Sequence, residues 1–86
     1  MPIISAFFGI IIRMYFDDHV PPHFHAEHAG QHATFDFSGR LLAGSIRSAT
    51  ARKLVRQWAR AHEDELVENW NRAKKLQPLA QIAPLE

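Results

Sequence analysis

Five of the six histidines in this 86-residue chain fall within residues 19–37. Two of them, His23 and His25, are separated by a single residue, and carboxylates follow them in the same stretch. Imidazole is the side chain best suited to proton transfer near neutral pH, and it is a common ligand of metal ions. These residue types therefore allow two kinds of chemistry, acid–base catalysis and metal binding, provided that the fold brings the side chains together.

The same stretch has the alternating pattern of a β-hairpin. The apolar residues that alternate with polar ones are Phe24, Ala26, Ala33, Phe35 and Phe37. A period of two places the apolar and polar sets on opposite faces of a sheet. A two-residue turn at Ala29-Gly30 would put Glu27 opposite His32 and His23 opposite Asp36, with both strands agreeing on which face is apolar. The pattern predicts one core face and one face of histidines and carboxylates.

Metal binding is the first chemistry to consider on the polar face. His23 and His25 share one side of a strand and Asp36 is expected opposite His23, and two imidazoles with a carboxylate are a known ligand set for zinc or iron. However, side chains on one strand face point roughly parallel, and the spacing fixes no third ligand. The chain has no cysteine, so thiolate sites and disulfides are excluded. We therefore expect no metal, no stoichiometric zinc and no cofactor.

Metal-independent cleavage of RNA is the second chemistry. The candidate catalytic residues are His23, His25, Glu27, His32 and Asp36. In this hypothesis the His23–Asp36 and Glu27–His32 pairs orient the imidazole rings, and Arg13 and Tyr15 lie nearby on the same face. The simpler and more common interpretation is that these are structural cross-strand pairs, each contributing about 0.2 to 1 kcal/mol to the sheet.

A weak binding surface is the third feature. Arginines recur every four residues after position 50, and the residues of this basic stripe are Arg52, Lys53, Arg56 and Arg60. Such a stripe suits phosphates or an acidic partner protein. A solvated helix face is the more common origin of this pattern. The net charge of +1 favours no partner class.

The remaining pattern predicts an α+β fold. Ala6–Phe16 is expected to be the first strand, residues 23–37 the hairpin and residues 41–46 a fourth, weaker strand. Ser48 is expected to cap a helical region over 49–75, which lacks Gly and Pro. The acids of the His62–Glu65 segment favour a break there, because negative charge is favourable at the start of a second helix. One long bent helix is the alternative.

These elements predict one domain over residues 1–76 and an extended tail over residues 77–86. The architecture would be a small antiparallel sheet of about four strands, with the C-terminal helices packed on one face. The predicted core consists of Ile10, Ile12, Phe24, Phe35, Phe37, Leu54, Trp58 and Trp70. An apolar content of 47% is that of a globular chain. The N-terminal apolar run is too short to span a bilayer and has no basic segment before it, so we expect a cytoplasmic protein with no membrane partner.

Several segments carry a family resemblance. They are Met14–His19, the motif Pro-Pro-His-Phe-His-Ala at 21–26, Trp58-Ala59 and Asn69-Trp70. With them, the chain resembles the small bacterial proteins of domain of unknown function 4160. The resemblance implies an α+β fold of this size. It also implies a gene paired with that of another small domain of unknown function (2442), in a toxin–antitoxin-like arrangement.

The resemblance leads to a functional expectation that composition alone does not supply. We expect one half of a small two-protein module that acts through protein–protein interaction, with a small partner protein encoded nearby. A homodimer is one alternative, and nucleic acid is another possible partner. The alternative function is the metal-independent ribonuclease of the histidine face.

Overall fold

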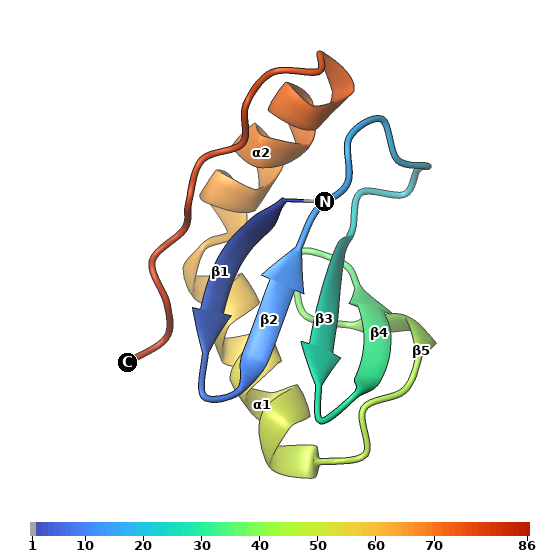
Figure 1. Cartoon of the computed structure of the whole chain (residues 1–86), viewed down its shortest axis with the longest axis vertical. Helices are drawn as coiled ribbons and strands as arrows, with labels where there is room; N and C mark the ends of the chain where they lie inside the picture. The colour runs from blue at the N-terminus through green and yellow to red at the C-terminus, as the bar shows by residue number, and fades with distance from the viewer. Residues whose placement is uncertain (1) are drawn as a thin grey trace.

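The computed structural model describes residues 2–86 and shows one five-stranded antiparallel sheet followed by two helices (Figure 1). The strands are β1 (Ile3–Phe7), β2 (Ile10–Arg13), β3 (Phe24–His28), β4 (Gln31–Phe35) and β5 (Leu41–Gly44), and they lie in the sheet in this order. The helices are α1 (Ala49–Ala61) and α2 (Glu63–Lys74). The predicted α+β class and its C-terminal helices are confirmed, with five strands rather than about four.

The extra strand arises because the expected first strand, Ala6–Phe16, contains a turn at Phe8-Gly9 that divides it between β1 and β2. Phe8 and Gly9 both have positive φ, 49° and 76°, as in the tight turns that match the twist of paired strands. Phenylalanine is an unusual residue at such a turn, which hid the turn in the sequence. The reversal leaves Phe8 exposed, and it buries Phe7 against Trp58 with ring centroids 5.5 Å apart.

The β3–β4 hairpin has the predicted register. Its turn is Ala29-Gly30, again with positive φ at both residues, 51° and 76°. Glu27 pairs with His32, and the other cross-strand pairs are Phe24 with Phe35, His25 with Thr34, Ala26 with Ala33, and His28 with Gln31. The alternating sequence therefore sets which side chains reach each face of the sheet.

The helical region is divided at His62, as the acidic segment predicted. Ser48 Oγ accepts a hydrogen bond from the Ala51 amide at 3.0 Å and caps α1. His62 leaves helical geometry, with φ −127° and ψ 28°, and acids occupy the first turn of α2. Negative charge is favourable at that helix end, so a second helix begins there. The alternative of one long bent helix is wrong.

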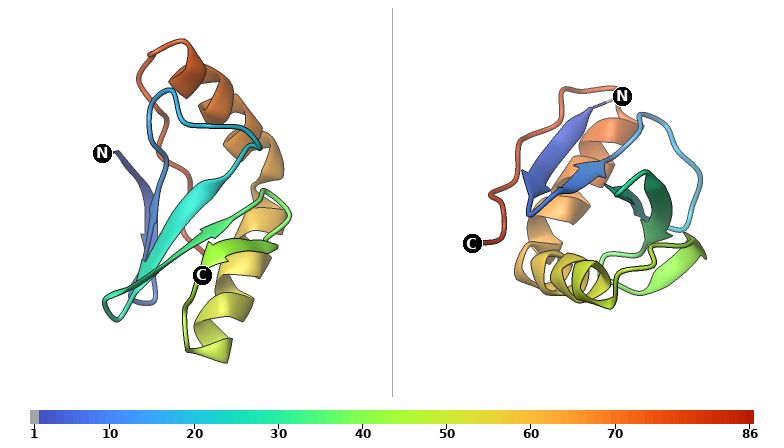
Figure 2. Two further views of the ribbon diagram at one scale, coloured as in Figure 1. Left: turned by 90° about the vertical axis from the view of Figure 1, so that its right-hand side faces the viewer. Right: turned by 60° about the horizontal axis from the view of Figure 1, so that its bottom comes forward.

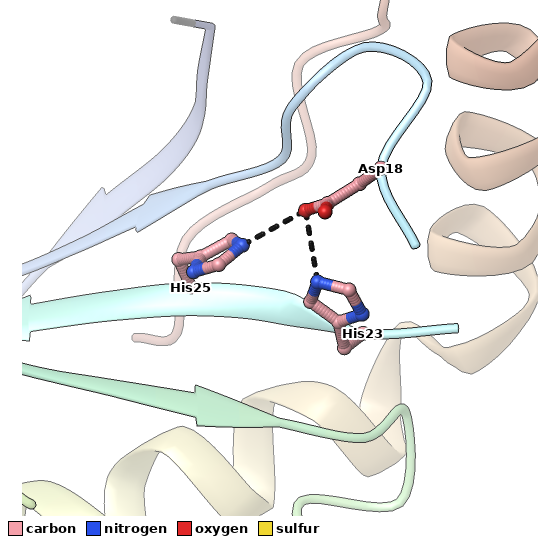
Figure 3. Close-up of side chains that lie close together, drawn as sticks. All are labelled: Asp18, His23 and His25. Carbon is pink, nitrogen blue, oxygen red and sulfur yellow. Dashed lines mark hydrogen bonds and ion pairs between the residues drawn. The ribbon is translucent and has the colours of Figure 1, made fainter. Parts of the chain in front are cut away.

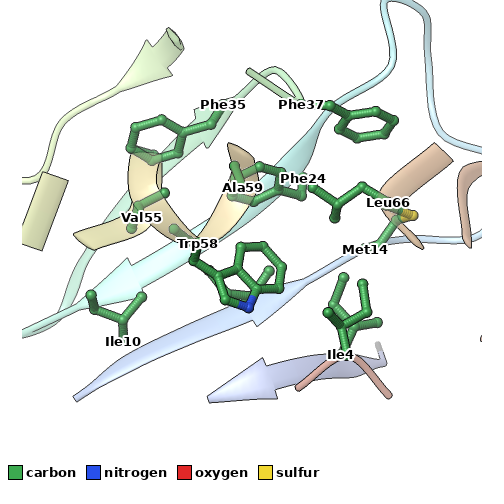
Figure 4. Packing of buried hydrophobic residues seen from close by; sticks show 14 of the residues in the cluster. Ile4, Ile10, Met14, Phe24, Phe35, Phe37, Val55, Trp58, Ala59 and Leu66 are labelled. Carbon is green, nitrogen blue, oxygen red and sulfur yellow. The ribbon is translucent and has the colours of Figure 1, made fainter. Parts of the chain in front are cut away.

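The core lies between the sheet and the helices (Figure 4). Trp58 is fully buried, and its ring meets that of Phe24 edge-on at a centroid distance of 5.5 Å. Phe24 stacks on Phe35 at 5.7 Å. The predicted core is confirmed: seven of its members are buried in one cluster, and Leu54 packs against that cluster while partly buried.

The C-terminal segment, residues 77–86, has no helix or strand and runs beside β1 (Figure 1). Its Ile82 is buried, and the Ile82 amide donates to the Ile4 carbonyl at 2.8 Å. The segment therefore covers the outer edge of β1, which leaves β5 as the uncovered edge of the sheet within residues 2–86.

The helices pack on one face of the sheet and leave its other face open, as two further views show (Figure 2). Residues of the central strands alternate between these faces, so the polar set of β2, β3 and β4 lies on the open face. No helix in the described part of the chain is long and apolar enough to cross a membrane.

Candidate functional site

The open face of the sheet is hollowed where its polar residues gather. The volume of this sheet hollow is about 320 Å³. Its polar lining consists of Arg13, Tyr15, His25, Glu27, His32 and Thr34. Arg13 ends β2, Tyr15 lies two residues beyond it, and the others come from β3 and β4; apart from Tyr15, their backbones are held by ladder pairing. The hollow is thus built on rigid strands, as a preorganised site requires.

Charge in the hollow centres on Glu27. Arg13 Nη1 donates to Glu27 Oε1 at 2.7 Å. His32 Nδ1 lies 3.6 Å from the same oxygen, and the His32 side chain is 72% exposed. The predicted Glu27–His32 neighbours are therefore found, although their separation is longer than a hydrogen bond. One carboxylate lies between a cation and an imidazole that solvent can reach.

A second group of polar side chains adjoins the hollow where β3 begins. We call it the Asp18–His23–His25 cluster (Figure 3). Asp18 Oδ2 lies 2.8 Å from His23 Nε2 and 3.1 Å from His25 Nε2. His25 belongs to both groups, because its ring also lines the hollow. His23 is buried, whereas Asp18 and His25 are partly buried.

Each member of the cluster is also held from outside. His23 Nδ1 lies 2.7 Å from the Pro21 carbonyl oxygen, and His25 Nδ1 lies 3.4 Å from Thr34 Oγ1. The second carboxylate oxygen of Asp18 accepts the backbone amide of His19 at 2.8 Å. Both imidazoles therefore turn Nε2 toward one carboxylate oxygen while their Nδ1 atoms are occupied elsewhere.

The environment of Asp18 favours its charged form. Burial alone would raise the pKa of this carboxyl group, but hydrogen bonds from His25, from the His19 amide and from His23 outweigh that effect. The pKa of Asp18 consequently lies below its usual value of 3.8. The cluster holds a negative charge between two imidazoles at neutral pH.

The predicted pairing of His23 with Asp36 is wrong. β3 begins at Phe24, so His23 lies beyond the ladder and uses both ring nitrogens on Pro21 and Asp18. Asp36 instead closes its own turn: its Oδ1 accepts the amides of Ser38 and Arg40 and the Ser38 hydroxyl. Asp36 is therefore a structural residue of the β4–β5 connection.

Asp18 is the site residue that sequence reasoning missed. It lies in the connection between β2 and β3, where no periodicity shows the direction of a side chain. The only signal was composition, an acidic pair immediately before a segment with two prolines and a histidine-rich strand. The residues of the hairpin alone therefore gave no third metal ligand beside His23 and His25.

The basic stripe lies on α1, and its members differ in their contacts. Arg52 Nη1 donates to the carbonyls of Ile46 and Arg47, so it braces the start of the helix. Arg60 Nε donates to the Ser38 carbonyl at 3.3 Å. Arg56 and Arg60 border a shallow surface hollow beside the Ser38–Leu41 turn, and Lys53 is exposed.

The fold and the site define a small α+β protein with a histidine–carboxylate site on the open face of an antiparallel sheet. Residues 9–71 match the family model described as domain of unknown function (DUF4160), and the chain belongs to this family. The matched region contains the sheet hollow and the Asp18–His23–His25 cluster. No curated protein and no solved structure matches the chain.

Proposed function

We propose that the protein is the RNA-cleaving member of a small two-protein module and that it acts at the sheet hollow. One observation carries the proposal: the face that the helices leave open brings Arg13, His25 and His32 to a single hollow. A cation and two imidazoles are the groups needed for acid–base attack on a phosphodiester. The volume of the hollow is at the lower end of the range for ligand sites, which suits two successive nucleotides of RNA rather than a large folded RNA.

The chemistry uses the 2′-hydroxyl that distinguishes RNA from DNA. A base removes the 2′-hydroxyl proton, the 2′ oxygen forms a bond to phosphorus, and the bond from phosphorus to the 5′ oxygen breaks. An acid gives its proton to the departing 5′ oxygen, so the products are a 2′,3′-cyclic phosphate and a 5′-hydroxyl. The cation stabilises the extra negative charge on the phosphate in the transition state.

The positions of three side chains support a role for each in this proposal. His25 turns Nε2 toward Asp18, so Nδ1 is the nitrogen that exchanges a proton with substrate, which would replace the long 3.4 Å contact to Thr34 Oγ1. His32 is the second proton-transfer group, since its ring is exposed beside Glu27. Arg13, whose Nη1 donates to Glu27, lines the hollow and is the cation that would contact a phosphate there.

The test is cleavage of a short RNA labelled at both ends, with the products examined for a 2′,3′-cyclic phosphate. We expect His32→Ala to reduce the rate by about 10²- to 10⁴-fold, the usual range for a proton-transfer group, and Arg13→Ala to reduce it by about 10²- to 10³-fold, as for a lost transition-state donor. Lys75→Ala, an exposed cation at the end of α2, is the matched surface control and should cleave normally. If the wild-type protein leaves RNA intact with and without divalent ions, the ribonuclease proposal fails.

The partner protein is the second part of the proposal. β1 is covered by the C-terminal segment, whereas every residue of β5 is exposed and its outer edge has no neighbouring strand among residues 2–86. An uncovered edge that carries Leu41 and Leu42, 44% and 42% exposed, suits pairing with a strand of a second protein. A protein seated there adjoins the hollow, because Gly44 of β5 lines it.

A purely binding role is the second candidate function, and the exposed β5 edge favours it. The probe is the product of the neighbouring gene, co-expressed with this protein and co-purified. Leu42→Asp should prevent co-purification, while Val67→Asp, at a similarly exposed apolar site on α2, should not. Co-purification without RNA cleavage supports binding alone, and inhibition of cleavage by the co-purified protein supports the two-part module.

A further inference from the structure

The geometry points to a binding site for a divalent transition-metal ion, of the zinc type, at the Asp18–His23–His25 cluster. This inference goes beyond the proposed function, and only the catalytic use of the ion rests on that function. Three potential ligand atoms, one carboxylate oxygen and two imidazole nitrogens, lie within 4.8 Å of one another in this cluster. They belong to residues that lie close in sequence but come from a connection and a strand, so the fold brings them together.

The spacing of the ligand atoms is close to that of a zinc site. Zinc binds imidazole nitrogen and carboxylate oxygen at about 2.0 to 2.2 Å, so ligand atoms in a tetrahedral site lie about 3.3 Å apart. Asp18 Oδ2 is 2.8 Å from His23 Nε2 and 3.1 Å from His25 Nε2. These two separations are within about half an ångström of that spacing, and the two imidazole nitrogens lie within 4.8 Å of each other.

The outer contacts are those of a metal site. Metal-binding histidines almost always donate their second ring N–H to a carbonyl or another acceptor, which fixes the ring and its tautomer. His23 Nδ1 meets the Pro21 carbonyl and His25 Nδ1 meets Thr34 Oγ1. The His19 amide holds the other oxygen of Asp18. All three residues thus leave one ligand atom facing the same point.

The hydrogen-bond partners of His23 also require a proton or a cation between His23 Nε2 and Asp18 Oδ2. The Pro21 carbonyl can only accept, so the hydrogen in this contact is on His23 Nδ1. In a neutral ring Nε2 is then a bare acceptor, and it faces a carboxylate oxygen at 2.8 Å in a buried position. Two acceptors at this distance repel unless a proton or a metal ion lies between them.

The ligand set selects the class of ion. Two imidazoles and one carboxylate with open positions suit Zn²⁺ or Fe²⁺, whereas Mg²⁺ and Ca²⁺ prefer oxygen ligands. The cluster adjoins the sheet hollow, because the ring of His25 belongs to both, and the rings of His25 and Tyr15 meet edge to face with centroids 4.4 Å apart. In the ribonuclease, a bound ion would fix His25 Nδ1 as a proton donor and would itself activate the attacking hydroxyl.

The test measures metal binding with no substrate present. The apo protein, prepared by dialysis against a chelator, is titrated with Zn²⁺ by calorimetry and with Co²⁺ by visible absorption. We expect one ion per chain, bound at least about 100-fold more weakly by His25→Ala and by Asp18→Asn, since even outer contacts are worth 10- to 100-fold. His19→Ala is the matched control, because it removes an exposed imidazole of the same connection and keeps the amide that holds Asp18. Circular dichroism of each variant shows that the fold is retained.

The outcomes separate the two proposals. The inference is overturned if the wild-type protein binds no stoichiometric Zn²⁺ or Co²⁺, or if His19→Ala or His32→Ala weakens binding as much as His25→Ala does. RNA cleavage by the wild-type protein in chelator, together with no Zn²⁺ or Co²⁺ bound in the titration, leaves the proposed function standing and overturns the metal site. One bound ion that depends on His25 and Asp18, with no cleavage of RNA, supports the metal site and overturns the ribonuclease.

Discussion

His23 Nε2 lies 2.8 Å from Asp18 Oδ2, across a connection that contains two prolines. The same connection is held at its far side by α2, since the Asp17 amide donates to the Ala73 carbonyl at 3.2 Å and Lys74 Nζ donates to the Asp18 carbonyl. His23 packs against Trp70 of α2, with ring centroids 5.4 Å apart. The candidate site is therefore fixed by the helix as well as by the sheet, which explains how a loop residue can hold two strand-end histidines in place.

The turn at Asp36 gives a prediction on pH dependence. Burial acts to raise the pKa of Asp36, but hydrogen bonds from Ser38 and Arg40 outweigh it and hold the pKa below the usual 3.8. A lowered folded pKa adds stability that is present above the unfolded pKa and is lost as pH falls through the folded pKa. We expect Asp36→Asn to cost on the order of 1 kcal/mol, evenly from about pH 6 to about pH 9, and less below about pH 4.

Denaturant unfolding of the wild type and Asp36→Asn across this range measures that cost. The pairing with His23 that the alternation suggested predicts a different profile, a cost larger below neutral pH than at pH 9. That profile would contradict the turn-closing role that the structure gives Asp36. Ser45→Ala, at an exposed serine that follows β5, is a neighbouring control with no carboxylate involved.

The difference between these two profiles shows what the sequence can and cannot predict here. Alternation sets the register within the β3–β4 ladder, so the Glu27–His32 pairing and the apolar face were predicted correctly. The ladder ends at Phe24 and Phe35, and beyond it side-chain direction depends on the turn and on contacts with α2. Asp18 and Asp36 both lie in such connections, so their partners required the three-dimensional structure.

The core gives a second prediction. Phe35 is 2% exposed and stacks on Phe24 beneath α1, so Phe35→Ala should destabilise the protein by about 3 to 5 kcal/mol. Phe8→Ala is the matched control, because Phe8 is 62% exposed in the β1–β2 turn, and it should cost below about 1 kcal/mol. Thermal denaturation compares the two variants. Equal losses of stability would contradict the assignment of Phe35 to the core and of Phe8 to the surface.

The contact between the β4–β5 connection and α1 gives a third prediction. Gly39 has φ 88°, and a methyl group there would meet the Arg56 Cα and Cγ atoms at 2.7 Å. Gly39→Ala should therefore cost about 1 to 3 kcal/mol for overpacking, added to about 1 kcal/mol for the left-handed backbone. Gly30→Ala meets nothing within 4 Å and has a similar φ of 76°, so it should show the backbone cost alone.

Urea unfolding of both glycine variants isolates the packing term, since the backbone term is common to both. A Gly39→Ala protein as stable as Gly30→Ala would show that α1 can move away from the turn at little cost. Such a result would also weaken the use of Arg56 and Arg60 as a fixed binding surface, because the hollow they border depends on this contact.

The attachment of the C-terminal segment gives the last prediction. Asn69 is 1% exposed on α2, and its side chain makes both hydrogen bonds of a backbone mimic with Ala80, donating to the carbonyl at 2.8 Å and accepting the amide at 2.9 Å. Asn69→Ala removes both and leaves the Ala80 groups without these partners, which should cost about 2 kcal/mol or more. Asn71→Ala, at an exposed asparagine of the same helix, should be nearly neutral.

Hydrogen exchange at the Ile82 amide tests the mechanism of that loss. Ile82 donates to the Ile4 carbonyl of β1, and Trp58 Nε1 donates to the Ala83 carbonyl at 2.9 Å, so the segment has further attachments beyond Ala80. If Asn69 is the main anchor, Asn69→Ala makes the Ile82 amide exchange faster although its acceptor, the Ile4 carbonyl, is unchanged, and the β1 edge opens. Unchanged protection at Ile82, with the loss confined to Ala80, would instead show that Ile82 and Trp58 hold the segment without Asn69.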